Sequence, residues 1–231
     1  MSSRDAAGRA DHGGRLKRLH ADRELLTREH PYLDYHLDEA DALGVAGGPV
    51  PMLLPDGQID PIEIEVEFHR LYPARPPLVR EVGGRFRPDD DRHIAADANF
   101  CLYLRDVDEP DLGSPHALHV FMLDVVCFLE QQLIYERIGR FPGPQWPHKR
   151  DAYALYIVER LHDQSSEAAA RLWEVVRGSR QSRNAPCPCG CGVKYKKCHL
   201  TLATELARVA ARYELAGFDY EALRRYAGVA A

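Results

Sequence analysis

Alternation of apolar and charged residues marks the clearest strand in the chain. Between positions 62 and 68, isoleucine, valine and phenylalanine alternate with three glutamates. This period of two predicts a strand with one buried face and one solvated face. Pro55, Asp56 and Gly57 form a turn signal just before it, so we expect residues 50–54 to pair with the strand in a hairpin.

Helical periodicity lies on both sides of this region. Residues 15–29 carry leucines at positions 16, 19, 25 and 26 and end before Pro31, which predicts an amphipathic helix. The later segments with helical patterns are 116–139, 149–162, 166–177, 200–215 and 220–226. The first residues are Ser, Ala, Gly and charged types, so we expect residues 1–14 to be a flexible N-terminus.

A proline-rich corner and a long loop separate the strand from the later helices. The corner reads Tyr-Pro-Ala-Arg-Pro-Pro over residues 72–77, where the prolines exclude helix, and a short strand is expected at 78–82. Residues 83–115 have few apolar positions, and a loop of that length inside a compact domain is usually functional. The order of elements predicts an α+β fold with an antiparallel sheet.

Composition places the chain among ordinary globular proteins. It has 231 residues, of which 45% are hydrophobic and 28% charged. No uninterrupted apolar run reaches the ~18 residues that a spanning helix needs, so we expect no membrane partner. The polar, arginine-rich start lacks the apolar core of a secretory signal, which favours a cytoplasmic location.

Basic residues gather in one segment of an acidic chain. Between positions 171 and 200, seven residues are basic and one is acidic, a net charge of +6. Because the whole chain carries −5, the remainder carries −11. An acidic body is untypical of a protein built to coat nucleic acid, so only the basic segment offers nucleic acid a binding surface.

Four of the six cysteines lie within twelve residues, and Cys101 and Cys127 stand alone. Such clustering indicates a metal site rather than a disulfide framework. Cys127 lies in a helix that is apolar nearly all round, which predicts a core position without chemistry. Cys101 lies in a loop rich in His, Asp and Asn, where it is either a small buried hydrophobe or a nucleophile.

The setting of Cys101 resembles that of the ubiquitin-conjugating enzymes. An N-terminal helix and a meander precede the Tyr-Pro-x-x-Pro-Pro corner at residues 72–77, and a Cys-Leu pair follows 24 positions after Pro77. Three strings are similar to the bacterial branch of that superfamily: Asp91-Arg92-His93, Glu130-Gln131-Gln132 and Tyr135-Glu136. The resemblance implies a UBC-like antiparallel meander flanked by helices, with a thioester carried on Cys101.

The chain departs from the family pattern beside the cysteine. Most members have an asparagine eight residues upstream, in a His-Pro-Asn string, whereas His93 occupies that distance here and is followed by Ile94 and two alanines. Either His93 or Asn99 is able to supply a donor to the oxyanion, while His93 is equally suited to ordering the loop. Asp97 is a candidate for orienting the incoming amine, and a solvated acidic loop is the alternative.

The cysteine-rich segment at residues 184–200 closely resembles the SEC-C motif of the bacterial secretion ATPase. The motif implies a structural zinc ion held by Cys187, Cys189, Cys198 and His199. Cys191 stands where the motif normally has serine, so it is either a spectator or a competing ligand. The basic residues of this zinc knuckle provide the surface for docking a partner or nucleic acid; they are Arg183, Lys194, Lys196 and Lys197.

These resemblances imply a domain plan. A ubiquitin-conjugating-like domain is expected at 15–165, a helix and linker at 166–183, the SEC-C motif at 184–200 and a helical tail at 201–231.

They also imply an enzyme that accepts a ubiquitin-like modifier from an activating-like enzyme and transfers it to a protein target, in bacteria often for antiviral defence. The alternatives are an inactive adaptor with the same fold and a cysteine hydrolase with His93 or His119 as base.

Overall fold

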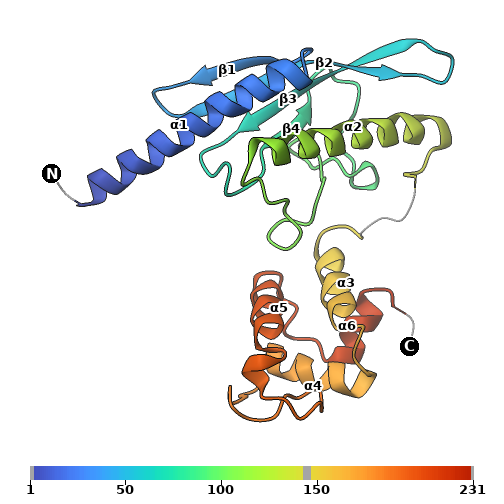
Figure 1. Cartoon of the computed structure of the whole chain (residues 1–231). Helices are drawn as coiled ribbons and strands as arrows, with labels where there is room; N and C mark the ends of the chain where they lie inside the picture. The colour runs from blue at the N-terminus through green and yellow to red at the C-terminus, as the bar shows by residue number, and fades with distance from the viewer. Residues whose placement is uncertain (1–2, 143–146, 230–231) are drawn as a thin grey trace. The chain divides into compact units, whose positions relative to one another are not determined.

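The computed structural model describes residues 3–142 and 147–229. The chain divides into two compact units, Met1–Gly143 and Pro144–Ala231, each with its own core (Figure 1). The fold is mixed α+β, as the order of elements predicts.

The first unit is a four-stranded sheet with two long helices. Its elements are α1 (Ser3–Glu29), β1 (Asp34–Asp38), β2 (Leu43–Leu53), β3 (Ile59–Phe68), β4 (Leu78–Glu81), the short 3-10 helix η1 (Asp90–Arg92) and α2 (Pro115–Ile138). The strands pair antiparallel in the order β1-β2-β3-β4. The predicted hairpin is confirmed, with Val50 opposite Ile62.

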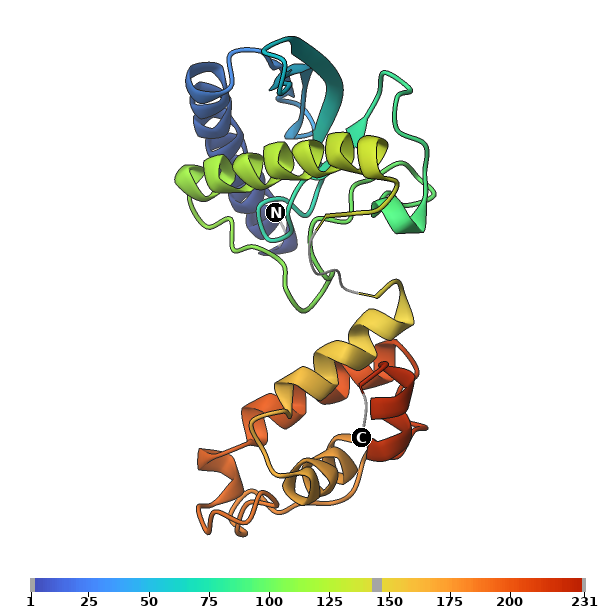
Figure 2. The same ribbon diagram turned by 90° about the vertical axis from the view of Figure 1, so that its right-hand side faces the viewer.

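Alternation along β3 divides the sheet into two faces. Ile62, Ile64 and Val66 are buried, whereas the intervening glutamates are exposed or half-buried. The buried face packs in one hydrophobic cluster with residues of α1 and α2, such as Leu26 and Met122. The two helices lie against the strands and against each other (Figures 1 and 2).

The Tyr-Pro corner is anchored to α1 by a buried polar network that the sequence pattern does not reveal. The Tyr72 hydroxyl donates to Asp22 at 2.7 Å, and Arg18 donates both to Asp22 at 2.8 Å and to the Tyr72 hydroxyl at 2.9 Å. Arg18 also donates to the carbonyl oxygens of Leu112 and Ser114, just before α2. One arginine therefore links α1, the corner and the end of the long loop.

We expect Tyr72→Phe to lower the free energy of unfolding of the first unit by about 1–3 kcal/mol, because Asp22 and Arg18 each lose a buried partner. Hydrogen exchange of the α1 and β3 amides, read by mass spectrometry, measures the change locally. Tyr35→Phe is the matched control, since the Tyr35 hydroxyl is buried with no hydrogen-bond partner in the described structure. Equal losses in the two variants would contradict a role for the network.

Two local features of the first unit differ from the expectation. The helix begins at Ser3, so the segment expected to be flexible is helical from there on, while residues 1 and 2 lie outside the described part. Its alanines, arginines and other helix formers favour that conformation despite Gly13 and Gly14. Strand β1 had no signal of its own, since three of its five residues are exposed polar ones and only Tyr35 is fully buried.

The outer side of α2 is apolar and solvent-exposed, and Cys127 lies on it. The prediction that Cys127 is buried in the core is therefore wrong. One side of the helix contacts the sheet unit, while the exposed apolar residues of the opposite side are Val120, Leu123, Ile134 and Ile138. By length and composition α2 is apolar enough to cross a membrane, a criterion that core helices of soluble proteins also meet, and 44% of its most apolar window is buried.

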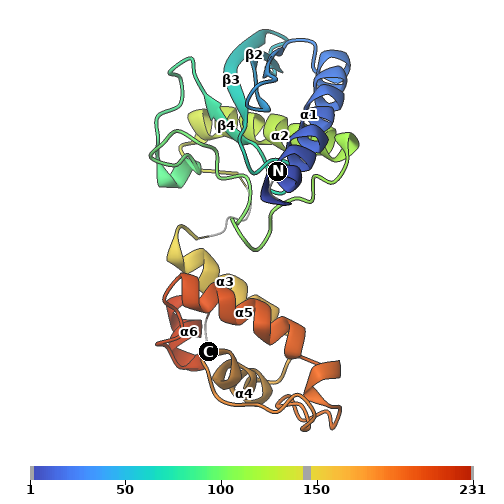
Figure 3. The same ribbon diagram turned by 90° about the vertical axis from the view of Figure 1, so that its left-hand side faces the viewer.

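The second unit is a small helical domain. It contains α3 (Arg150–Arg160), α4 (Ser166–Val176), the 3-10 helix η2 (Tyr195–Lys197), α5 (Leu200–Arg212) and α6 (Tyr220–Tyr226). Figure 3 shows α3 and α5 side by side, and α4 and α6 pack with them. Its core includes Ile157, Trp173, Leu206, Leu215 and Leu223, all fully buried.

This grouping changes the expected domain plan. Helix α3 was assigned to the first domain at 15–165, but it packs on α5 and α6 in the second unit. The segment expected as a tail from residue 201 is likewise part of the folded unit, because Leu206 and Leu223 are buried in its core. Hydrophobic periodicity predicts where the helices are, but it does not predict which helices pack against each other.

Candidate thiol site and metal centre

The loop between β4 and α2 holds Cys101 on a fixed backbone. Backbone bridges join Ile94 to Phe100 and Arg80 to Asn99, so the second half of the loop runs beside β4. The Phe100 N–H donates to the Val79 carbonyl at 2.8 Å, and the Phe100 ring lies 4.6 Å from that of Phe128 on α2. The residue before Cys101 is thus buried between the sheet and α2.

Cys101 itself is exposed, so the expectation of a buried hydrophobe does not hold for it. Its N–H donates to the His93 carbonyl at 2.8 Å, which fixes the main chain from which the thiol projects. The geometry therefore presents an accessible thiol on a fixed backbone.

Displacement of water by the surrounding atoms raises the pKa of the Cys101 thiol, and the carboxylates of Asp90 and Asp97 raise it further. Arg105 and the backbone N–H of Ala95 act in the opposite direction. The thiol is consequently neutral at rest near neutral pH. A group that arrives with positive charge is attracted by the same carboxylates that disfavour the thiolate.

The other residues singled out beside Cys101 lie in the same loop. Asp97 accepts from the Asn99 backbone N–H at 3.3 Å and bonds the Asn99 side chain, which holds the pKa of the Asp97 carboxyl below its ordinary value. The Asn99 Oδ1 atom is buried with no hydrogen-bond partner among the described residues. His93 has a left-handed backbone with φ of 55° and stacks its ring edge-on against Phe141.

A further anchor of this loop comes from α2. Gln132 is fully buried; its Oε1 accepts from Arg92 at 2.9 Å, and its Nε2 donates to the Arg92 carbonyl at 2.7 Å. The Arg92 guanidinium also lies over the rings of Phe86 and Tyr135. Arg92 and Gln132 stand out in the sequence only through the family resemblance, because a contact between residues 40 positions apart leaves no local signal. Arg92 precedes His93, so this contact fixes the loop next to the thiol.

We expect Asp97→Asn to lower the pKa of Cys101, because it removes a carboxylate that disfavours the thiolate. Asparagine keeps the acceptor for the Asn99 N–H, so the turn is retained. The rate of Cys101 alkylation by iodoacetamide, followed at peptide level against pH, measures the shift. Asp111→Asn, which alters a similar turn at Gly113, is the control and leaves the profile unchanged. A profile displaced to higher pH in Asp97→Asn would contradict the assigned field.

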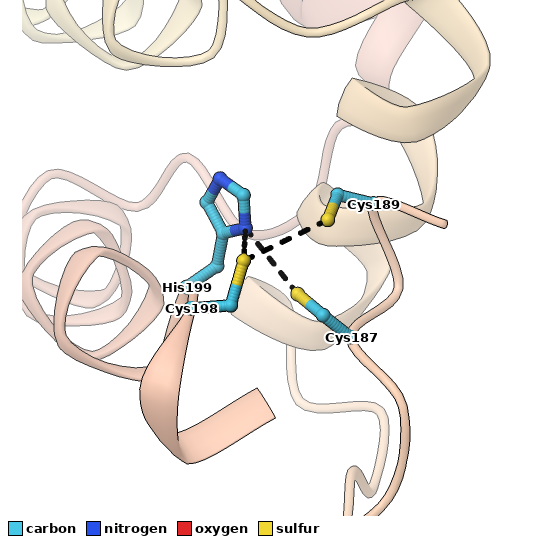
Figure 4. Close-up of side chains that lie close together, drawn as sticks. All are labelled: Cys187, Cys189, Cys198 and His199. Carbon is cyan, nitrogen blue, oxygen red and sulfur yellow. Dashed lines mark hydrogen bonds between the residues drawn. The ribbon is translucent and has the colours of Figure 1, made fainter. Parts of the chain in front are cut away.

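The four side chains expected as ligands lie together in the second unit (Figure 4). The Nδ1 atom of His199 lies 3.3 Å from Sγ of Cys187 and 3.0 Å from Sγ of Cys198. The sulfurs of Cys189 and Cys198 are 3.8 Å apart. All four donor atoms lie within 4.8 Å of one another, and Cys187 is buried.

A short hairpin and a 3-10 turn bring the donors together. The Cys187 N–H donates to the Val193 carbonyl at 2.8 Å, and Pro186 forms a backbone bridge with Lys194. The turn η2 then leads to Cys198, and His199 stands directly before α5. Arg171 of α4 donates to the Pro188 carbonyl at 2.8 Å, which ties the cluster to the helical core.

The donor set fits a tetrahedral metal ion. Two sulfurs bound to one ion by bonds of about 2.3 Å are about 3.8 Å apart, which matches the Cys189–Cys198 separation. Desolvation and the neighbouring thiols raise the pKa of Cys198, so this thiol retains its proton unless a cation replaces it. Three thiols and one imidazole leave no open position for a substrate on a four-coordinate ion.

Comparison with known proteins assigns this cluster to a family. Residues 183–201 match the SEC-C motif, a metal-binding motif. The chain is 45% identical over 42 residues to protein translocase subunit SecA of Solibacter usitatus (strain Ellin6076). That similarity covers 18% of this chain and 4% of the translocase subunit. No solved structure matches the chain.

Proposed function

We propose that this chain is a ubiquitin-conjugating-like acyltransferase that holds a ubiquitin-like modifier as a thioester on Cys101. The observation that carries the proposal is the exposed thiol on a fixed backbone beside β4, in a loop that follows the Tyr-Pro-x-x-Pro-Pro corner. The order of α1, the β1-β2-β3-β4 meander, this loop and α2 supports a UBC-like fold for the first unit.

The proposed reaction consists of two acyl transfers. In the first, the Cys101 thiolate attacks the carbonyl carbon of the activating enzyme's thioester; a new C–S bond forms, the old one breaks, and the departing thiolate takes up a proton. In the second, a neutral amine of the target attacks the carbonyl carbon of the Cys101 thioester; a C–N bond forms, the C–S bond breaks, and the departing thiolate of Cys101 takes up the proton that the amine loses. The raised pKa of the resting thiol limits unproductive reactions, and the Ala95 N–H favours the thiolate when it forms.

The residues beside Cys101 have proposed roles in the second transfer. Ionised Asp97 attracts and orients the ammonium form of the target amine. Asn99 and His93 are the candidates for supporting the oxyanion in place of the asparagine that most family members have. The unpartnered Oδ1 of Asn99 is an acceptor, so support of the oxyanion would come from the Asn99 Nδ2, which bonds Asp97 in the resting loop.

The proposed metal is zinc, and its role is structural. Three thiols with one imidazole suit Zn²⁺ in tetrahedral geometry, and a closed ligand set supplies folding energy rather than catalysis. Cys187, Cys189, Cys198 and His199 would hold the ion and join the knuckle to the start of α5.

The proposed partners follow from the acyltransferase assignment. They are a ubiquitin-like modifier, an activating-like enzyme and a protein target, in the bacterial cytoplasm and in the setting of antiviral defence. The exposed basic residues of the knuckle are the surface for docking, and only they would meet nucleic acid; they are Arg183, Lys194, Lys196 and Lys197.

An inactive adaptor with the same fold is the second candidate. It is favoured by the Ala95-Ala96 pair in the segment where the family asparagine is expected, together with the exposed lysines of the knuckle. An adaptor binds the modifier or its target without forming a covalent adduct.

Reconstitution separates the two candidates. The full chain is incubated with ATP, an adenylating enzyme and a ubiquitin-like protein. The acyltransferase gives a new species whose mass is the sum of chain and modifier less one water, and thiol reductant removes it. Binding of the modifier without any such adduct would favour the adaptor.

A further inference from the structure

Cys191 lies beside the four predicted ligands but is not one of them. Its sulfur is 3.6 Å from that of Cys198, close to the 3.8 Å between Cys189 and Cys198. Two sulfurs on one tetrahedral ion are about 3.8 Å apart. The distance between the sulfurs of Cys191 and Cys198 is therefore close to that expected for two ligands of the same ion.

The turn leaves room around this fifth sulfur. Cys191 is exposed and lies between Gly190 and Gly192, whose φ angles of 88° and 77° suit glycine. A side chain at Gly192 would meet no atom within 4 Å, and one at Gly190 would meet the Arg171 guanidinium at 3.7 Å. We therefore expect the exposed side chain of Cys191 to reach other rotamers about its Cα–Cβ bond.

A fifth donor consequently lies beside one ligand of a site that a tetrahedral ion fills with four, outside the group of four donors that lie within 4.8 Å of one another. His199 is the one nitrogen donor, and its Nδ1 lies next to the sulfurs of Cys187 and Cys198. We propose that Cys191 is an alternative ligand, which takes the fourth position when His199 leaves it. The site then holds its ion in either a three-sulfur, one-nitrogen form or a four-sulfur form. The four-sulfur form favours soft thiophilic ions such as Cd²⁺.

Cobalt binding tests the proposal in the full chain. Apoprotein is loaded with Co²⁺, and the intensity of the sulfur-to-cobalt charge-transfer band reports the number of bound thiolates. His199→Ala is expected to bind one Co²⁺ per chain with a stronger band than the parent protein. His199→Ala combined with Cys191→Ser is expected to bind Co²⁺ at least about tenfold more weakly, since a residue bound directly to the ion matters at least as much as the groups that hydrogen-bond to such a residue.

The matched control removes the other exposed cysteine. His199→Ala with Cys127→Ser loses a thiol of the first unit and is expected to behave as His199→Ala alone. Equally weak Co²⁺ binding in His199→Ala and in its Cys191→Ser combination would overturn the proposal, as would a charge-transfer band of unchanged intensity in His199→Ala.

A second measurement leaves His199 intact, in case its loss unfolds the knuckle. The ratio of Zn²⁺ to Cd²⁺ dissociation constants is compared between the parent protein and Cys191→Ser by competition with a chromophoric chelator. The proposal predicts that Cys191→Ser loses preference for Cd²⁺ while still binding one ion per chain. An unchanged ratio would show that Cys191 is a spectator.

Discussion

Cys101→Ala is expected to abolish the reductant-sensitive adduct completely, because no other described thiol shares its backbone and electrostatic setting. Cys101→Ser is expected to give a slower adduct that survives reductant and is released by hydroxylamine, since an oxygen ester replaces the thioester. Intact mass spectrometry of the reconstituted reaction measures both outcomes.

Cys127→Ala is the matched control for this prediction. Cys127 is exposed in the same unit, but it projects from α2 rather than from the Cys101 loop. The adduct should form on this variant at the parent rate. Equal adduct on Cys101→Ala and Cys127→Ala would contradict the assignment of Cys101 as the acceptor.

Removing two ligands of the metal centre is the second large effect. Cys187→Ser with Cys198→Ser leaves three donors even when Cys191 is counted, so we expect metal content to fall from about one ion per chain to none. Structural zinc supplies about 10–16 kcal/mol of apparent binding energy in small motifs, which the knuckle cannot replace with its single fully buried aromatic, Tyr195. Elemental analysis gives the metal content.

Limited proteolysis of the same variant shows how far the damage extends. Cleavage is expected within residues 181–199, while the sheet unit and the helices around Trp173 resist, because both cores are built without the knuckle. Cys191→Ser is the control and should keep its metal and its protease resistance. Collapse of the sheet unit in the double variant would show that the metal supports the whole chain.

Elements whose pattern is local were predictable from the sequence. The alternation of apolar residues and glutamates predicts strand β3. Helix α6 was predicted at its observed bounds, Tyr220–Tyr226. The sequence did not show that α3 belongs to the second unit. An apolar helix face indicates that the face is buried, but not which elements cover it. For the same reason the apolar run around Cys127 suggested burial, although the sheet unit covers only one side of α2.

The candidate sites divide in the same way. The cysteines of the metal centre are clustered, so their spacing indicated a metal site, and the resemblance to the SEC-C motif then singled out the four expected ligands that lie together in the structure. Cys101 was singled out as a candidate through the family resemblance of the corner and the Cys-Leu pair. The contacts that hold the loop and the corner in place were not predictable from the sequence, since Gln132 contacts Arg92 across 40 residues and Tyr72 contacts Asp22 across 50. Such contacts exist only once the chain has folded.

The distribution of aromatic side chains gives the two units separate optical signatures. Trp173 lies in the second unit and is fully buried, with its indole N–H donating to the Phe218 carbonyl at 2.9 Å. Emission from Trp173, isolated by Trp146→Phe, therefore reports on the second unit, whereas far-ultraviolet circular dichroism sees both units. Followed together during denaturation, the two signals would resolve which unit melts first in the intact chain.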